Sequence, residues 1–265
     1  ATADLKDVNM IDNFHLDAYG ISAVNYNRDL EIFPVLKNIL TKITGEEIYK
    51  SPTDMGVNSI SKCIVDDKLI CAAANREIVR RYYQALVDNK LNGADIEIAN
   101  RIKLLMNELN LDKNIITERE IALKKAEKEN KPVIAMTLPN GKTITGKETN
   151  LLTPASSLII NAIKVLSKID DEIFLLSPHV LEPILRLKKE SLKENQLLTL
   201  KDVLIALSIC SATNPIIEKA LVTLKELSNT NAHATYIVDG EDLMIFKKLK
   251  INLTCEPEFY DNHIA

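Results

Sequence analysis

Short polar side chains gather between residues 49 and 67, and they are of the types that bind phosphate groups or sugar hydroxyls. The segment supplies a cation, two hydroxyls, a carboxylate and an amide, from Lys50, Ser51, Thr53, Asp54 and Asn58. Such groups can converge on a phosphate or a polyol when the loop that carries them folds back on itself. The same residue types also make ordinary turns and helix caps. The segment is therefore a candidate ligand site, with a structural role as the alternative.

A second candidate position is the start of a helix predicted at 154–168. Thr153 precedes Pro154, which is the pattern of an N-cap hydroxyl followed by proline at the first helical position. Backbone N–H groups at such a start, next to Thr153 and Ser156, favour an anion. Ser177 and Pro178 repeat the pattern before a predicted helix at 178–194. We expect the ligand site where the 49–67 loop meets these helix starts.

Residues that could ligate a metal occur near the beginning of the chain. Asp12 and His15 would lie on one face of a short helix, with Asp4 and Asp7 nearby. Helix caps and solvated acids explain the same residues without a metal. We therefore expect no metal site.

Composition and charge limit the classes of partner. The chain has 265 residues, long enough for two domains, with 46% hydrophobic and 26% charged residues and a net charge of −4. This balance offers no electrostatic attraction for nucleic acid or an anionic membrane, and no apolar run reaches the length of a membrane span. We expect a small-molecule ligand as partner. The four cysteines form no CxxC pair and fit the reduced core of a cytoplasmic protein; they are Cys63, Cys71, Cys210 and Cys255.

The first half of the chain is predicted to be helical. Apolar residues recur at helical spacing over 28–43, 72–88, 94–109 and 117–130. Thr117 and Glu120 have the spacing of a capping box at the start of the last of these helices. Arg76, Arg80 and Arg81 are spaced to hold an anion, although pairing with nearby acids is the commoner role of such arginines.

The second half alternates strands and helices. Strands at 133–138 and 143–147 flank Asn140 and Gly141, a dipeptide that suits a tight hairpin turn. Further strands are predicted at 173–176, 233–238 and 251–255, and helices at 154–168, 178–194, 200–210, 215–227 and 240–249. We therefore predict a mixed α/β fold with a helical domain at 1–112 and an α/β domain at 113–265.

The segment ALKKAEKENKPVIAMTLPNGKTITGKETN, with the helices after it, resembles the opening of a cytidine deaminase-like α/β/α domain. That resemblance implies a zinc site at two helix starts. The first holds Pro154-Ala155-Ser156 and the second holds Pro178-His179-Val180-Leu181-Glu182, so the cysteine ligands and the general base are missing. His179 and Glu182 alone make an incomplete zinc site.

The chain as a whole resembles the C-terminal half of uncharacterised protein family 0371, a bacterial family with a domain of unknown function. The segments that carry the resemblance are ATADLKDVNMID, AVNYNRDLEIFPVL, YKSPTDMGVN, IVRRYYQAL, VLIALSICSATNP and KINLTCEP. The resemblance implies a longer protein, in which a nucleotide-binding-like domain with a glycine-rich phosphate loop precedes this chain. Any nucleotide cofactor would belong to that longer protein, and none is evident here. Some members are labelled ATP-dependent peptidases, but the chain carries no HExxH motif or recognisable nucleophile.

Two classes of function fit these observations. The first is binding of, or action on, a small phosphorylated or nucleotide-like metabolite, together with the upstream domain. The alternative is a non-catalytic role in oligomerisation or ligand sensing, and a zinc-dependent deaminase is the least favoured reading. Residues 158–166 and 203–210 are apolar around much of each helix, so we expect a homo-oligomer, with burial in the domain core as the alternative.

Overall fold

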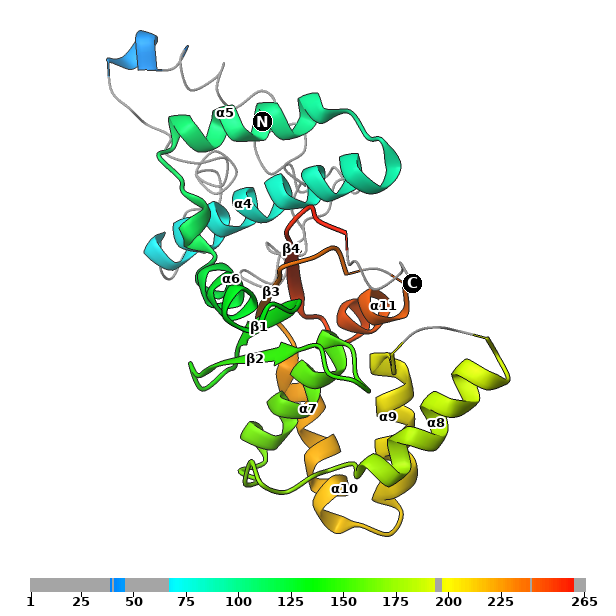
Figure 1. Cartoon of the computed structure of the whole chain (residues 1–265). Helices are drawn as coiled ribbons and strands as arrows, with labels where there is room; N and C mark the ends of the chain where they lie inside the picture. The colour runs from blue at the N-terminus through cyan, green and yellow to red at the C-terminus, as the bar shows by residue number, and fades with distance from the viewer. Residues whose placement is uncertain (1–38, 40, 46–66, 194–196, 239, 260–265) are drawn as a thin grey trace, which may run out of the picture. The chain divides into compact units, whose positions relative to one another are not determined.

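The structure is a computed structural model that describes residue 39 and residues 41–45, 67–193, 197–238 and 240–259 (Figure 1). It divides into two units, Ala1–Ile115 and Ile116–Ala265. The helix predicted at 28–43 lies mostly outside the described residues, and so does the polar segment at 49–67 except for its last residue.

In the described part of the first unit, two of the predicted helices pack together. Helix α4 spans Asp67–Asn92 and helix α5 spans Ile96–Glu108, followed by a 3-10 turn η3 at Lys113–Ile115. Their shared core includes Val79 and Tyr83 of α4 and Leu105 of α5, each with 0% of its surface exposed. Asp95 begins α5 by accepting a hydrogen bond from the Glu97 N–H, at 2.9 Å. Helix α4 is longer than predicted at both ends.

The second unit opens with helix α6, Thr117–Glu129, and the hairpin of strands β1, Val133–Thr137, and β2, Thr143–Lys147. The strands pair antiparallel, with Met136 opposite Ile144. Gly141 has a φ of +80°, and the Leu138 N–H donates to the Lys142 carbonyl across the turn at 2.9 Å. The hairpin prediction is confirmed. Gly141 provides the positive φ that the turn needs, which glycine adopts readily.

Strand β3, Asn231–Ala234, and strand β4, Asn252–Cys255, complete a mixed sheet in the order β2-β1-β3-β4. Strand β3 pairs antiparallel with β1 and parallel with β4. The parallel pair needs a crossover, and helix α11, Gly240–Lys248, provides it. The predicted mixed α/β fold is confirmed.

Helices cover both faces of this sheet. Val133 and Ala135 of β1 pack against Ala122 of α6 on one face. On the other face, Gly146 of β2 lies against Leu158 of helix α7, Pro154–Leu166. Successive residues of a strand point to opposite faces, so the apolar run of β1 is buried on both sides.

Three further helices pack together beside α7 (Figure 1): α8, Pro178–Glu190, α9, Leu200–Ser211, and α10, Pro215–Val222. A 3-10 segment η4, Thr223–Leu227, continues α10. The prediction of a strand at 173–176 is wrong, because those residues form an irregular segment with bends. Asp170 accepts two hydrogen bonds from the backbone of this segment, which a strand would use for pairing. Its side chain accepts from the Glu172 N–H and its carbonyl accepts from the Ile173 N–H, both at 3.1 Å.

The capping box predicted at Thr117 and Glu120 is also wrong. Ile116 is the N-cap of α6 and makes no side-chain cap bond, while Glu120 pairs with Lys124 along the helix. A capping box occurs instead at the start of α9, between Thr199 and Asp202.

Candidate functional site

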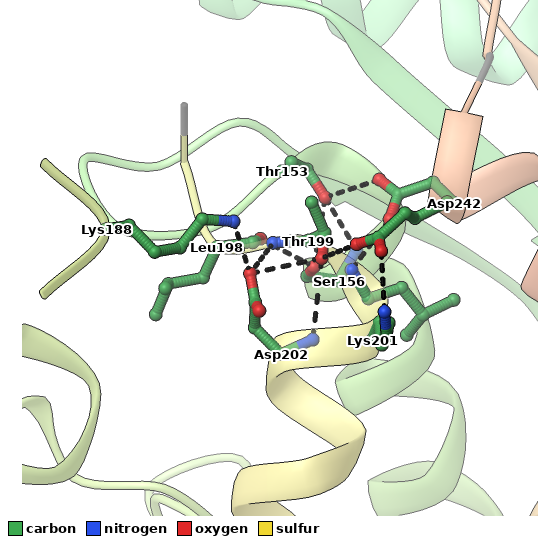
Figure 2. A network of polar contacts seen from close by, with 10 residues as sticks. Thr153, Ser156, Lys188, Leu198, Thr199, Lys201, Asp202 and Asp242 are labelled. Atoms are coloured by element: carbon green, nitrogen blue, oxygen red, sulfur yellow. Dashed lines mark hydrogen bonds and ion pairs between the residues drawn. The ribbon is translucent and has the colours of Figure 1, made fainter. Parts of the chain in front are cut away.

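The starts of α7, α9 and α11 meet in a group of hydrogen-bonded side chains and backbone groups, drawn in Figure 2. We call this group the helix-start network. It comprises Thr153, Ser156, Lys188, Leu198, Thr199, Leu200, Lys201, Asp202, Glu241 and Asp242.

Two hydroxyl groups organise the start of α7. Thr153 is the N-cap and accepts from the Ser156 N–H at 3.3 Å, as the Thr153-Pro154 pattern predicts. The Ser156 hydroxyl is buried and donates to the Leu198 carbonyl at 2.9 Å, and the Thr153 hydroxyl donates to Asp242 Oδ2 at 2.9 Å. The cap of α7 is therefore tied to the segment before α9 and to the first turn of α11.

Asp242 is the buried acid of the network. Its second oxygen, Oδ1, accepts from the Leu200 N–H at the start of α9, at 2.7 Å. Burial raises the pKa of Asp242 above its ordinary value, although the bonds from Leu200 and Thr153 favour the charged form. The carboxylate thus occupies a position at a helix N-terminus that favours an anion.

Asp202 and Lys188 form an ion pair in the network. The Lys188 side chain is 8% exposed, and its Nζ lies 2.7 Å from Asp202 Oδ2. The same oxygen accepts from the N–H and the hydroxyl of Thr199, at 2.9 and 3.1 Å. The capping box therefore provides hydrogen bonds that help to offset the cost of burying Lys188.

Lys201 and Glu241 form the accessible edge of the network. Their side chains are 56% and 42% exposed, and Lys201 Nζ lies 2.7 Å from Glu241 Oε1. The hydrogen bond to Glu241 raises the pKa of Lys201 above its ordinary value. The Thr199 hydroxyl lies 3.3 Å from Glu241 Oε2. Each carboxylate of the network bonds to a group of a neighbouring helix, so the arrangement fastens α7, α8, α9 and α11 to one another; the carboxylates are those of Asp202, Glu241 and Asp242.

The structure brings together two of the predicted site residues, Thr153 and Ser156. The other five, Lys50, Ser51, Thr53, Asp54 and Asn58, lie outside the described residues. Sequence reasoning missed the acids of the helix-start network. Asp242 gave no local signal, since 89 positions separate it from Thr153. Asp202 did give a local signal, because Thr199-x-x-Asp202 resembles a capping box.

The remaining candidates have separate structural roles. Arg80 and Arg81 both pair with Glu77, at 2.6 and 2.8 Å, which is the commoner role expected for them. His179 and Glu182 are exposed on α8. Among the residues that the structure describes, no three His, Cys, Asp or Glu side chains are grouped so that they could hold a metal ion.

The structure describes the side chains of Cys210 and Cys255, and both are free thiols. Cys255 is buried, and burial raises its pKa to about 12, so its thiol is unreactive at neutral pH. Within the same described ranges, no helix combines the length and apolar character needed to cross a bilayer.

The fold and this network define a two-part α/β protein, with a helical unit followed by a mixed sheet covered by helices. Two family models match it: the N-terminal domain of unknown function DUF1846 over residues 1–110, and the C-terminal DUF1846 domain over residues 115–264. The chain belongs to the DUF1846 family.

Similar proteins carry the name UPF0371 protein. One from Clostridium tetani strain Massachusetts / E88 is 46% identical over 269 residues, and those from Clostridium botulinum strains Kyoto and Alaska E43 are 47% identical. Each match covers 98% of this chain and 54% of the relative. The chain therefore spans about half the length of the curated relatives it matches. Neither the two family models nor these relatives are named as deaminases, so they do not support the cytidine deaminase-like resemblance.

Proposed function

We propose that this chain acts as a non-catalytic assembly unit, and that a second copy of the chain packs on the outer face of α9. The observation that carries the proposal is the exposure of Ile205 and Ile209, at 52% and 70%. These residues are four apart, so they lie on one face of the helix. The opposite face is in the core, with Val203 and Leu207 fully buried.

The helix-start network supports this role because it holds the first turn of α9 in place. Leu200, Thr199 and Asp202 all bond within the network. A face that is fixed before binding loses less conformational freedom when a partner covers it. Two antiparallel copies of α9 would place Ile205 of one against Ile209 of the other, which is the self-complementary pattern of a twofold interface.

Of the two helices expected to drive self-association, α9 keeps accessible apolar surface. In α7, Leu158, Ile159 and Ile163 have no exposed surface, which matches the alternative of burial in the core. The apolar character of α7 is therefore explained within the unit, and that of α9 is explained only in part.

The test is molar mass by light scattering across micromolar concentrations. We expect the chain to dimerise, and the double variant Ile205→Gln with Ile209→Gln to be monomeric with an unchanged circular dichroism spectrum. Ile216→Gln is the matched control, since Ile216 of α10 is 43% exposed and lies outside the α9 face. A wild-type chain that stays monomeric contradicts the proposal.

A second candidate function is binding of a small phosphorylated or nucleotide-like metabolite, shared with the part of the longer relatives that this chain does not span. Its specific support is Lys201, an accessible cation at the start of α9 beside the Thr199 hydroxyl. A cation next to a helix N-terminus suits a phosphate. The loop residues Lys50, Ser51, Thr53, Asp54 and Asn58 stay part of this proposal.

A thermal-shift screen with nucleotides and sugar phosphates separates the two functions. Stabilisation that disappears in Lys201→Gln places the ligand at the start of α9, and stabilisation that disappears in Asp54→Asn places it at the loop. No stabilisation by any of these compounds, in this chain or in a full-length relative, contradicts the second candidate.

A further inference from the structure

A second polar cluster, made of different residues, lies on the α6 face of the sheet. His233 of β3 is fully buried and is paired in register with Ala135 of β1 and Thr254 of β4. Helix α6 covers this face, and its first turn contributes Glu118 and Arg119 to the surroundings of the imidazole. Glu256 follows directly after β4.

The hydrogen bonds of Thr254 determine which nitrogen of His233 carries the proton. The Thr254 hydroxyl donates to the Ala232 carbonyl at 3.2 Å. A hydroxyl has one proton to donate, so its oxygen accepts from His233 Nδ1, which lies 2.7 Å away. In the neutral ring Nδ1 is therefore protonated and Nε2 is the basic nitrogen.

One oxygen of Glu256 lies between two nitrogen groups. Oε1 is 2.5 Å from Arg119 Nε and 3.4 Å from His233 Nε2. The Arg119 contact is a short hydrogen bond between charged groups, and the His233 contact is longer than a normal hydrogen bond. At these distances the carboxylate is engaged mainly with Arg119.

The charged groups around His233 act in opposite directions. Burial and the Arg119 charge lower the pKa of His233, while Glu256 and Glu118 raise it, and the net direction is downward. Burial also raises the pKa of Glu256, but His233 and Arg119 more than offset this and hold it below its ordinary value. Strand β1 contributes only Ala135 at this register position, so the charges come from α6 and from Glu256.

We propose that Glu256 is a proton-controlled switch between Arg119 and His233. A proton that binds to Nε2 from solvent turns the His233 contact into an ion pair with Oε1 and weakens the bond from Oε1 to Arg119. The consequence falls on the first turn of α6, because the Arg119 side chain ties that turn to Glu256, directly after β4. The switch would make the start of α6 sensitive to pH.

The pH range follows from the direction of the shift. An unfolded histidine has a pKa of 6.5, and that of His233 in the fold is lower. The unfolded chain therefore takes up the proton first, and the fold loses stability as the pH falls below 6.5. The switch therefore operates below pH 6.5.

Nitrogen-15 NMR of the histidine rings in the intact chain tests the proposal. At neutral pH we expect His233 to be neutral with its proton on Nδ1. Arg119→Gln should raise the pKa of His233, because it removes a neighbouring positive charge, and Glu256→Gln should lower it, because it removes a negative one. His179→Asn, at an exposed position on α8, should leave it unchanged.

Amide hydrogen exchange gives the second readout. As His233 becomes protonated, exchange at Glu118, Arg119 and Glu120 should become faster relative to the middle of α6. His233→Asn should remove this pH dependence. If that variant does not fold, Arg119→Gln and Glu256→Gln carry the test, since both residues are partly exposed. A proton on Nε2 at neutral pH, shifts of the same sign in the two variants, or exchange that does not change with protonation would each overturn the proposal.

Discussion

The backbone of Gly146 in β2 lies directly against Leu158 in α7. A β-carbon on Gly146 would stand 2.2 Å from the Leu158 nitrogen and 2.5 Å from the Pro154 carbonyl oxygen. Both contacts are with backbone atoms, which cannot move aside without shifting the helix. The close packing of α7 on the sheet therefore requires glycine at this position.

We predict that Gly146→Ala lowers the free energy of unfolding by about 3 kcal/mol, the upper part of the range for overpacked sites. Urea denaturation measures this directly. Gly141→Ala in the same hairpin is the control: its φ is +80° but nothing lies within 4 Å of an added β-carbon. We expect a loss of about 1 to 2 kcal/mol there, from backbone conformation alone. A Gly146→Ala variant as stable as the wild type would show that α7 is not packed this closely.

Helix α9 begins with a capping box and helix α6 does not, and one pair of substitutions can test this difference. Thr199→Ala removes the hydroxyl that accepts from the Asp202 N–H, which is one side of the capping box, and should cost about 1 to 2 kcal/mol. Thr117→Ala should cost little, because Thr117 is inside α6 and its hydroxyl contacts only Glu118, at 3.4 Å. Thermal unfolding of the two variants gives the comparison, and equal losses would contradict the assignment of the caps.

These caps also show what sequence could predict and what it could not. The hairpin was predictable because Asn140 and Gly141 determine it locally, and the start of α7 was predictable because Thr153 and Pro154 are adjacent. The box at Thr117 was not predicted correctly, since the pattern holds at Thr117 and Glu120 as well as at Thr199 and Asp202. Which site is used depends on the partners that the fold supplies, and Asp202 finds Lys188.

The candidate site was predictable only in the part that belongs to one helix start. Thr153 and Ser156 follow from the cap pattern, but their partners come from other segments: Leu198 lies 42 positions from Ser156, and Asp242 lies 89 positions from Thr153. Contacts over such separations leave no periodic signal in one sequence. The strand expected at 173–176 failed for a related reason, because its apolar pattern does not reveal whether a partner strand is available.

Helix α11 is followed by a lysine, Lys250, whose backbone is in the left-handed conformation. Lys250 has a φ of +56°, and its N–H donates to the Lys247 carbonyl while the Ile251 N–H donates to the Phe246 carbonyl. This is the bond pattern of a Schellman motif, in which glycine is the preferred residue. We predict that Lys250→Gly stabilises the fold by about 1 kcal/mol, since it removes the steric cost of the left-handed conformation.

The control for this change has the opposite sign. Lys247→Gly alters an exposed lysine within the last turn of the same helix and should destabilise by about 1 kcal/mol. Urea denaturation of both variants separates an effect of position from a general effect of losing one positive charge. If both variants are destabilised, the left-handed lysine costs nothing in this fold.

The last prediction concerns the charge on Asp242. Burial raises its pKa above the ordinary value of 3.8, so the folded chain binds a proton at this site more tightly than the unfolded chain does. The contribution of Asp242 to stability is therefore fully present below pH 3.8 and is lost as the pH rises through the raised value. Asp242→Asn has no carboxyl group to titrate there. We expect wild type to gain stability relative to this variant as the pH falls from neutral toward 3.8.

Denaturation curves of wild type and Asp242→Asn at several pH values test this. Asp242→Ala serves as the comparison that removes both acceptors, for the Leu200 N–H and the Thr153 hydroxyl, and should cost about 2 kcal/mol at every pH relative to Asp242→Asn. If wild type instead loses stability relative to Asp242→Asn on acidification, the carboxylate is stabilised in its charged form. Asp242 would then act as a bound anion that strengthens the starts of α7 and α9, and a phosphate ligand at the start of α9 would have to displace it.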